Sequence, residues 1–296
     1  MVRRMANFWS EQSSSQVQSL PESKGTTAVH ESELHRREAD FHDEWALGTP
    51  LDKILVRECF EAPTAVENRF ILRQMGSLKN KKVLDIGAGL GESSVYFALQ
   101  GALVTAVDVS PRMIETAVSL GRRYGVQIQG VVSTGEDMGL PPEEFDLVYI
   151  ANTIHHIRDR ARLIEQVHRA LKPSGRFFSI DPIAYNPVIN VYRRMATQTR
   201  TEDESPLGLN DLREASRYFR DLKHREFWLA SLLLFIKYYV VDRVHPNEDR
   251  YWKRILRETW RTLWWWAPLR ALDSLLTRAP LMRYLAWNMV MWGTKA

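Results

Sequence analysis

The segment at 83–91, VLDIGAGLG, combines residue types that could hold a charged small molecule. An apolar strand ends at Ile86, glycines follow at 87, 89 and 91, and a helix-like run begins at Glu92. Glycine has no Cβ, so the backbone can turn sharply and approach a ligand closely. Free N–H groups at a helix start favour an anionic or carboxylate ligand. The segment therefore predicts a loop that binds a charged cofactor.

Asp108 is a second acidic residue, and it ends the next apolar run, 103–107. An acid about 20 residues after a glycine loop suits the hydroxyls of a ribose. A carboxylate has two acceptor oxygens, which match two hydroxyl donors. The pair of features predicts a cofactor that contains a nucleoside; the alternative is that Asp108 only forms a turn at the strand end.

The glycine spacing disfavours a nicotinamide or flavin cofactor. Such sites usually follow G-x-G-x-x-G, whereas here the third glycine comes one residue early, at Gly91, and Glu92 takes its place. Asp85 also precedes the loop, where its carboxylate would repel a pyrophosphate. A cofactor with a cationic amino-acid end would be tolerated there.

Four motifs follow one another at spacings that fit alternating strands and helices. They are the loop 83–91, VDVS at 107–110 with Met113, GEDM at 135–138 with FDLV at 145–148, and NTIHHI at 152–157 with LKPSGR at 171–176. In this order, over residues 82–182, they resemble class I S-adenosylmethionine-dependent methyltransferases of the small-molecule type, similar to the ubiquinone-biosynthesis and type-11 methyltransferases. The resemblance implies S-adenosyl-L-methionine as methyl donor and S-adenosyl-L-homocysteine as product.

The resemblance also implies a role for each cofactor-binding residue. The loop with Gly87, Gly89 and Gly91 would wrap the methionine end, and Asp85 would orient its amino group, directly or through water. Asp108 would accept from both ribose hydroxyls.

The adenine would be held by residues of the second and third motifs. Val109 and Met113 would flank the ring, Asp137 would accept from its amino group, and the Met138 N–H would donate to it. The alternative for Asp137 is a helix cap, with the adjacent Glu136 in its role.

Asn152 and His155 follow the fourth strand and would lie near the methyl donor. A histidine near neutral pKa could accept a proton from a hydroxyl or amine during transfer. The alternative is that His155 only packs or hydrogen-bonds beneath the cofactor, because methyl transfer can proceed by positioning alone.

Residues after the fifth strand are expected at the mouth of the site, where they could bind the acceptor. We assign Tyr185, Tyr192, Arg193 and Arg200 to this role, because arginines can hold a carboxylate or phosphate with forked donors. The alternative is a structural network between these arginines and the acidic run 202–204.

Strands and helices are expected to alternate, which argues for a parallel sheet with helices on both faces. Strands are predicted at 83–86, 103–107, 128–132, 145–150, 175–180, 224–228 and 288–294, and core helices at 92–99, 111–123 and 159–171. With helices expected at 31–55 and 62–75, the fold class is α/β: a doubly wound seven-stranded sheet of the Rossmann-like methyltransferase fold. It has an N-terminal helical cap and a helical insertion before the last strand.

We divide the chain accordingly. The parts are 1–27, a disordered or loosely ordered tail; 28–78, the helical cap; 79–228, the methyltransferase core; 229–287, an aromatic-rich helical insertion that serves as substrate lid; and 288–296, the final strand. The tryptophans of the insertion have three interpretations: the packed core of a lid, the lining of a pocket for an apolar acceptor, or a membrane-interface helix.

Composition excludes several classes of function. The 296-residue chain has a net charge of +4 and a pI of about 9.1, and IANT at 150–153 differs from the loop of DNA amino-methyltransferases, so no nucleic-acid substrate is expected. No Cys/His cluster has metal-ligand spacing, so no metal is expected. The single cysteine, Cys59, excludes an intrachain disulfide. With neither a secretory signal nor a membrane span in the sequence, we expect a cytoplasmic protein, in peripheral contact with a membrane or as a homodimer.

The sequence thus predicts an S-adenosylmethionine-dependent methyltransferase that acts on a small, largely apolar acceptor. A secondary metabolite, a quinone-like ring or a lipid-like molecule would suit, and O-methylation is favoured over C- or N-methylation. The alternative is a non-catalytic cofactor-binding or scaffold protein whose aromatic insertion docks a partner or a membrane surface.

Overall fold

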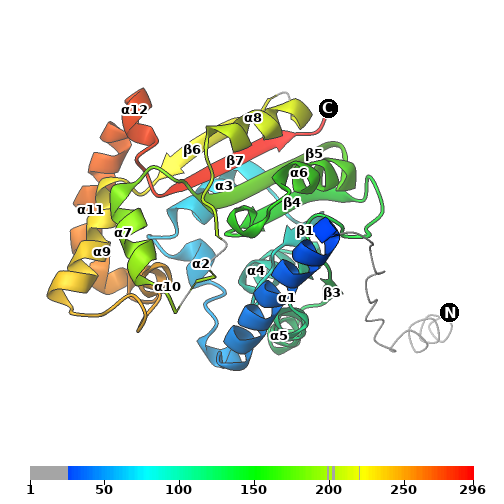
Figure 1. Cartoon of the computed structure of the whole chain (residues 1–296), viewed down its shortest axis with the longest axis horizontal. Coiled ribbons are helices and arrows are strands. Elements are labelled where there is room, and N and C mark those ends of the chain that lie inside the picture. The colour runs from blue at the N-terminus through cyan, green and yellow to red at the C-terminus, as the bar shows by residue number, and fades with distance from the viewer. Residues whose placement is uncertain (1–25, 199, 202–203, 220) are drawn as a thin grey trace.

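The computed structural model describes residues 26–198, 200–201, 204–219 and 221–296, with side chains from residue 33 onward. It contains a seven-stranded sheet with the order β3-β2-β1-β4-β5-β7-β6, flanked by helices on both faces (Figure 1). The first five strands are parallel, and β7 runs antiparallel between β5 and β6. The expected fold class is confirmed. The predicted tail, 1–27, lies almost entirely outside the described residues.

The strands form from largely apolar runs, and β1 and β2 end at a glycine loop and at an acidic residue respectively. Their bounds are β1 (Lys82–Ile86), β2 (Leu103–Asp108), β3 (Ile128–Val132), β4 (Phe145–Ala151), β5 (Leu171–Pro182), β6 (Lys223–Phe227) and β7 (Asn288–Thr294). β5 begins earlier than predicted, because Leu171 pairs with Phe145 before a register shift. β6 ends one residue early, because Trp228 adopts a positive φ of 64° that an extended strand does not allow.

Alternate residues of the central strands supply two apolar cores, one on each face of the sheet. Val83 and Tyr149 belong to one core, and their chain neighbours Leu84 and Val148 belong to the other. This alternation follows from the two-residue period of a strand. Both faces are covered, as a doubly wound sheet requires.

The core helices are α4 (Glu92–Leu99), α5 (Pro111–Arg123), α6 (Arg160–Ala170) and α8 (Leu209–Tyr218). In α5 and α6 a side chain at the helix start accepts from a free N–H group of the first turn. The Ser110 side chain accepts from Met113 N–H at the start of α5, and Asp159 accepts from Arg162 N–H at the start of α6. These caps hold the helices beside the strand ends that they follow.

The N-terminal cap consists of α1 (Thr26–Leu47), a short 3₁₀ turn η1 (Leu51–Lys53), α2 (Glu58–Glu61) and α3 (Val66–Met75). The helix predicted at 31–55 therefore ends eight residues early. Gly48 and Pro50 follow its last turn, and proline lacks the N–H that a continuing helix needs. α1 lies against α5 and is tied to it by a hydrogen bond from Ser110 Oγ to Asp43.

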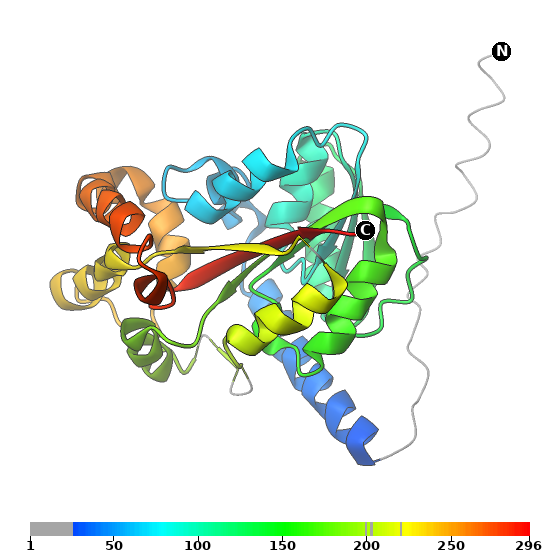
Figure 2. The same cartoon turned by 90° about the horizontal axis from the view of Figure 1, so that it is seen from above.

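The insertion and the segment after β5 form a helical layer beyond one end of the sheet (Figures 1 and 2). Its elements are α7 (Pro187–Met195), η3 (Ala230–Leu232), α9 (Leu233–Ile236), η4 (Lys237–Val241), α10 (Tyr251–Arg257), α11 (Thr259–Leu276) and α12 (Pro280–Arg283). Tyr238, Tyr251 and Phe235 form its aromatic core. Trp266 is buried, as the interpretation of a packed lid core expects, whereas Trp260, Trp264 and Trp265 are exposed, so that interpretation does not extend to these three.

Candidate functional site

A cavity of about 370 Å³ lies at the carboxyl ends of β1, β2, β4 and β5. The strand order reverses between β1 and β4, and ligands of open α/β sheets bind at such a switch point. The cap helices α1 to α3 form one wall, and α10 with the loop before β7 forms another. Residues of the cap, the core and the insertion thus line the same cavity.

The glycine loop curves around one end of this cavity. Gly87 and Ala88 both donate to the carbonyl of Val107, which fixes the loop against β2. Gly89 lines the cavity with a positive φ of 54°, and a Cβ placed there would meet only open space. Gly91 does not line it; its φ is 90°, and a Cβ would lie 2.6 Å from Ala117. Gly89 therefore leaves room for a ligand, and Gly91 lets α4 pack on α5.

Asp108 lies in the cavity wall and is 8% exposed. Its two oxygens accept from Gly89 N–H (2.9 Å) and Ser110 N–H (3.0 Å). Burial raises the pKa of this carboxyl, against the opposing charge of His42 and these N–H donors. Each oxygen keeps a second lone pair for a hydroxyl donor, so the residues fit the ribose of S-adenosylmethionine.

Asp85 does not line the cavity. It lies behind the loop, where its Oδ2 accepts from Ser93 (2.6 Å) and Ser94 (2.5 Å), both in the first turn of α4. Burial raises the pKa of Asp85 to about 6 despite these bonds. Asp85 is thus hydrogen-bonded to the start of α4. A direct contact with the amino group of the cofactor does not fit this position, and a contact through water stays a prediction.

Three residues that were predicted to hold the adenine do not line the cavity. Met113 and Met138 are buried in the apolar cores, and Asp137 is exposed. Glu136 lines the cavity in place of Asp137, and its Oε2 has no hydrogen-bond partner among the described residues. The physical reason is the turn at 134–137, whose bridge directs residue 136 inward and 137 to solvent.

Val109 and Asn152 line the cavity as expected. Asn152 has a positive φ of 53°, which asparagine tolerates better than most residues, and its N–H donates to Ile180 carbonyl (2.7 Å). This conformation ends β4 and turns the chain toward His155.

His155 is 7% exposed, lines the cavity and is held by Asp181. Its Nδ1 lies 2.8 Å from Asp181 Oδ1, and its Nε2 lies 3.8 Å from Glu204. Burial, with the nearby positive charges, lowers the pKa of His155 well below its ordinary value. Burial raises the pKa of Asp181 to about 8. The imidazole is therefore neutral near pH 7, and its position is set by Asp181.

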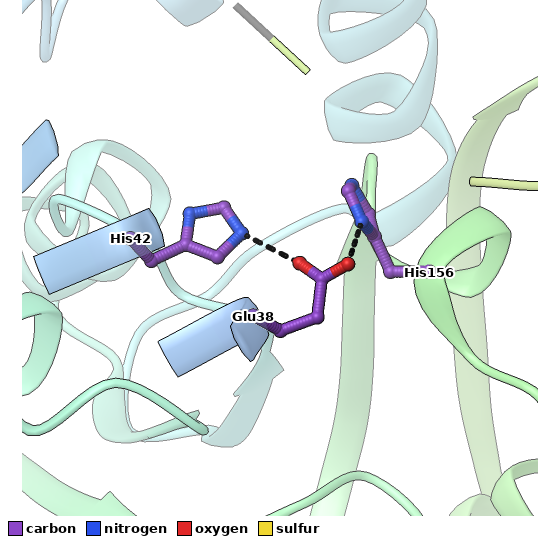
Figure 3. A group of neighbouring side chains, drawn as sticks. All are labelled: Glu38, His42 and His156. Carbon is purple, nitrogen blue, oxygen red and sulfur yellow. Dashed lines mark hydrogen bonds and ion pairs between the residues drawn. The ribbon is translucent and has the colours of Figure 1, made fainter. Parts of the chain in front are cut away.

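A second histidine joins the core to the cap (Figure 3). His156 Nδ1 lies 3.2 Å from Glu38 Oε1, and His42 Nε2 lies 3.5 Å from Glu38 Oε2. Burial works against charge on His156, but the bond to Glu38 and the charges of Glu38 and Glu204 outweigh it and raise its pKa. Glu38 is buried as well, and its histidine partners lower its pKa. We call Glu38, His42 and His156 the cap clasp.

The cap clasp also has ligand atoms that a metal ion could use. Among the described residues, Glu38, His42 and His156 place three such atoms within 4.8 Å of one another, and so do His155, His156 and Glu204. Sequence spacing could not reveal these groups, because α1 and the turn after β4 are far apart in the chain. The absence of a metal stays a prediction.

The residues predicted to bind the acceptor divide into two sets. Tyr192, Arg193 and Arg200 line the cavity, whereas Tyr185 is 44% exposed and accepts from Leu209 N–H at the start of α8. Tyr185 is thus outside the cavity. Arg200 is paired with Glu204 (Nε to Oε2, 2.6 Å), as the alternative interpretation expected.

No ion pair of Arg193 is found within the part of the chain that the structure describes. Its Nη1 is buried without a hydrogen-bond partner among the described residues, and burial with the charge of Arg200 lowers its pKa to about 10. A buried guanidinium nitrogen without a hydrogen-bond partner is costly, so Nη1 suits an anionic ligand group.

The far end of the cavity contains residues that the sequence analysis missed. Glu67 of α3 is 8% exposed and accepts from Asn288 Nδ2 (2.8 Å), and burial raises its pKa. Trp228 and Trp287 form the apolar wall beside this pair. The sequence contained one indication of this role, since Glu67 lies among the apolar positions of the helix predicted at 62–75. Only the fold shows which face of that helix meets the cavity.

Comparison with known proteins agrees with this geometry. Residues 84–179 match the family model described as a methyltransferase domain. A ubiquinone biosynthesis O-methyltransferase of Xylella fastidiosa is 36% identical over 103 residues, which are 34% of this chain and 42% of that protein. The methyltransferase YcgJ of Bacillus subtilis is 32% identical over 113 residues, which are 38% of this chain and 45% of the relative. The match thus spans less than half of each relative.

Solved structures share the fold over a larger part of the chain. YcgJ of Bacillus subtilis has a TM-score of 0.50 at 18% identity, covering 77% of this chain and 97% of its own. A methyltransferase of Haloferax volcanii, solved with the activator Trm112, has a TM-score of 0.54 at 16% identity, covering 86% and 97%. A Haemonchus contortus phosphoethanolamine N-methyltransferase in complex with S-adenosyl-L-methionine has a TM-score of 0.53 at 18% identity, covering 78% and 52%. The family model thus shows that residues 84–179 form a methyltransferase domain, and the solved structures share its Rossmann-like fold.

Proposed function

We propose that this chain transfers a methyl group from S-adenosyl-L-methionine to a small, largely apolar acceptor that carries a hydroxyl and an acidic group. The observation that carries the proposal is one cavity with two chemically different ends. Asp108 and the glycine loop form the nucleoside end, and Glu67 with Trp228 forms the other. Bound S-adenosylmethionine supplies a methyl group on a positively charged sulfur, which an acceptor nucleophile attacks in line.

Residues of the loop and of β2 would hold the donor. Asp108 accepts from the ribose hydroxyls, Glu136 accepts from the adenine amino group, and the space at Gly89 admits the methionine end. Asp85 and Asp108 together place negative charge around this end of the cavity, which favours a cationic cofactor over a pyrophosphate.

The other end would hold the acceptor. Its walls are aromatic and aliphatic, with Trp228, Trp287 and Ile189 among the lining residues. Burial of apolar surface there would contribute most of the affinity, at about 25 cal/mol per Å². The quinone-like, lipid-like and secondary-metabolite classes expected from the sequence all fit this wall.

Two side chains could accept the proton of an acceptor hydroxyl. His155 is neutral and oriented by Asp181, but its Nε2 faces Glu204. Glu67 is buried beside the apolar wall, and its raised pKa brings it closer to the working pH, which favours a general base. We assign the base role to Glu67 and the positioning of the loop after β4 to His155. A nearby carboxylate supports O-methylation, as does the likeness to relatives named O-methyltransferases.

Arg193 would fix the orientation of the acceptor by pairing with its acidic group. A carboxylate or phosphate there would satisfy the unpartnered Nη1. This requirement narrows the acceptor to an amphiphile, with the anion at Arg193 and the apolar body against Trp228.

Calorimetric titration with S-adenosylmethionine, S-adenosylhomocysteine and NADH, followed by a radiolabelled methyl-transfer screen of hydroxylated aromatic and lipid-like acids, tests the proposal. We expect binding of both sulfur nucleosides, none of NADH, and turnover of a hydroxylated acid. The Glu67→Gln variant should lose kcat and keep cofactor affinity. Preferential binding of NADH would overturn the cofactor assignment. Cofactor binding without turnover of any acceptor would favour the non-catalytic alternative.

A further inference from the structure

The outer side of the insertion presents large apolar side chains to solvent. Trp260, Trp264 and Trp265 of α11 are 74%, 89% and 64% exposed, and Leu275 of α11 and Leu281 of α12 are 61% and 84% exposed. We call these five residues the insertion face. Figures 1 and 2 place α9, α11 and α12 together at one end of the molecule, at the left of both views. Exposed Val240 and Val241, which follow α9, extend the apolar surface at this end.

Helix α11 has the reverse of the usual amphipathic arrangement. A surface helix normally turns its apolar side toward the core and its polar side toward water. Here the buried positions are Thr259, Thr262, Trp266 and Asp273, three of them polar, while Trp260, Trp264, Trp265 and Leu275 face outward. Large exposed apolar patches mark interaction sites. The pattern indicates that the outer side of α11 contacts an apolar surface of another molecule or of a membrane.

Specific hydrogen bonds hold α11 in this orientation. Asp273 is 1% exposed and accepts from the N–H groups of Leu229 (3.2 Å) and Ser231 (3.1 Å), and also from Ala230 N–H and Ser231 Oγ. Turning the helix by half a turn would bury the tryptophans but would leave this carboxylate and its donors unpaired. The outward position of the tryptophans is therefore fixed by the buried side of the same helix.

The charge around the insertion face identifies the kind of surface that it fits. Residues 251–287 contain seven Lys or Arg and two Asp or Glu, and four of the cations form ion pairs with acids outside this range. Of the two acids, Asp273 is buried, and Glu258 is paired with Arg254 (3.2 Å). Exposed Arg261 and Arg278 remain on α11 and just after it. Tryptophans among arginines match an interfacial helix on anionic lipid, whereas a second copy of this face would bring like charges together.

We propose that the insertion face docks the protein on a membrane surface that contains anionic lipids. Trp260 and Trp264 enter the headgroup region, and Arg261 and Arg278 contact lipid phosphates. None of the helices in the described part of the chain has the length and apolar character needed to cross a bilayer. In the docked state, α11 lies along the membrane surface.

Docking would bring the acceptor end of the cavity close to the lipid. Trp266, on the buried side of α11, lies 6.1 Å from Trp228, centroid to centroid, and Trp228 lines the cavity. If the proposed function holds, an amphiphilic acceptor could reach Trp228 from the membrane. The docking itself does not depend on methyl transfer.

Flotation of the full chain with two kinds of vesicle tests the proposal. One kind is phosphatidylcholine alone, and the other is phosphatidylcholine and phosphatidylglycerol in equal parts. We expect flotation with the anionic vesicles, weakened by salt, together with a blue shift of tryptophan fluorescence. Trp264→Ser should lower partitioning by about tenfold, because burial of one aromatic side chain is lost. Arg261→Glu should lower it on anionic vesicles.

Leu103→Ser is the matched control, because Leu103 is 61% exposed on β2, outside the insertion. It should float like the unaltered chain. Circular dichroism of each variant establishes that it is folded. Recovery of the unaltered chain in the soluble fraction with both vesicles would overturn the proposal, and so would equal flotation of Trp264→Ser. A dimer in light scattering that Trp264→Ser dissociates would assign the face to a second copy instead, whatever the outcome of the methyl-transfer assays.

Discussion

At the scale of single residues, Asp108 and Asp137 provide a direct test of the cofactor site. Asp108→Asn replaces one acceptor oxygen with an amide donor, so one ribose hydroxyl loses its partner. We expect affinity for S-adenosylhomocysteine to fall by about 10- to 100-fold, since a hydrogen bond to a charged group contributes about 1.5–3 kcal/mol. Calorimetry measures the change. Asp137→Asn is the control and should bind normally, because Asp137 is exposed and outside the cavity.

Two glycines of the same loop should respond differently to alanine. Both have positive φ, which costs alanine about 1–2 kcal/mol. At Gly91 the new Cβ would also clash with Ala117, which adds about 1–3 kcal/mol of unfolding free energy. At Gly89 the Cβ would enter open cavity space. Denaturant unfolding should show the larger loss for Gly91→Ala, and cofactor titration the larger loss for Gly89→Ala. Equal effects in both assays would contradict the division of roles.

Sequence alone identified residues that belong to local motifs and missed those that converge from distant segments. Asp108 ends β2, and Gly89 and Asn152 lie within three residues of the ends of β1 and β4, so the fold class alone placed them at the cavity. Glu38 and Glu67 lie on cap helices whose rotation is set by packing, and no local pattern specifies it. The sequence prediction chose Asp137, whereas Glu136 lines the cavity. Which of two adjacent acids faces inward depends on the geometry of the turn, and the sequence does not specify that geometry.

At the scale of elements, the cap clasp joins α1 to the turn after β4, and its strength should depend on pH. The pKa of Glu38 is depressed below its ordinary 4.5, so its contribution is present above pH 4.5 and is lost as pH falls through the lowered value. The pKa of His156 is raised above 6.5, so its contribution is complete below pH 6.5 and is lost as pH rises through the raised value. The clasp should therefore stabilise most between pH 4.5 and 6.5.

Thermal unfolding of the unaltered chain and of Glu38→Gln across this range measures the effect. We expect a difference in unfolding free energy of about 1–3 kcal/mol inside the window, narrowing on both sides. Glu44→Gln, on an exposed position of the same helix, should show no such window. A difference that grows steadily above pH 6.5 would show that the Glu38–His156 pair is not its source.

One buried carboxylate, Asp273, connects α11 of the insertion to the residues that follow β6. Asp273→Asn would exchange an acceptor of several hydrogen bonds for an amide that can accept fewer. We expect a loss of about 2–4 kcal/mol in unfolding free energy, because buried donors are left without partners. Chemical denaturation measures it. Ser274→Ala, at the adjacent exposed position of α11, should change stability little, and a similar loss there would point to helix propensity instead.

At the scale of the whole molecule, the number and the approximate positions of the strands could be predicted, whereas their order in the sheet was not predicted and the bounds of α1 and β5 differ from those expected. The sheet follows from alternation of apolar runs with glycine loops and capped helices. The outward side of α11 could not be predicted from its tryptophans, because the same residues suit a packed lid. The orientation of α11 is set by Asp273, which accepts hydrogen bonds from residues 229–231. Only the folded chain brings these residues close to Asp273.

The cap and the insertion contact each other beside the cavity. Binding of the cofactor at the nucleoside end should therefore stabilise both segments. Arg250 stacks over Trp45 of α1, 3.5 Å from the ring centroid, and Lys253 of α10 forms an ion pair with Glu92 of α4 (3.1 Å). A bound cofactor would add contacts to the loop before α4 and to α1 together. Local opening of this seam would then cost more, and its amides would exchange more slowly.

Hydrogen exchange with and without S-adenosylhomocysteine measures this coupling. We expect slower exchange in the peptides of α1 and α10 and unchanged exchange in α11, whose outer side does not face the cavity. Trp45→Ala should remove the protection of α10 while leaving that of the glycine loop, because the loop contacts the cofactor directly and α10 responds through the cap. Protection of α10 that persists in this variant would mean that the insertion senses the cofactor by a route other than Trp45, such as the ion pair with Glu92.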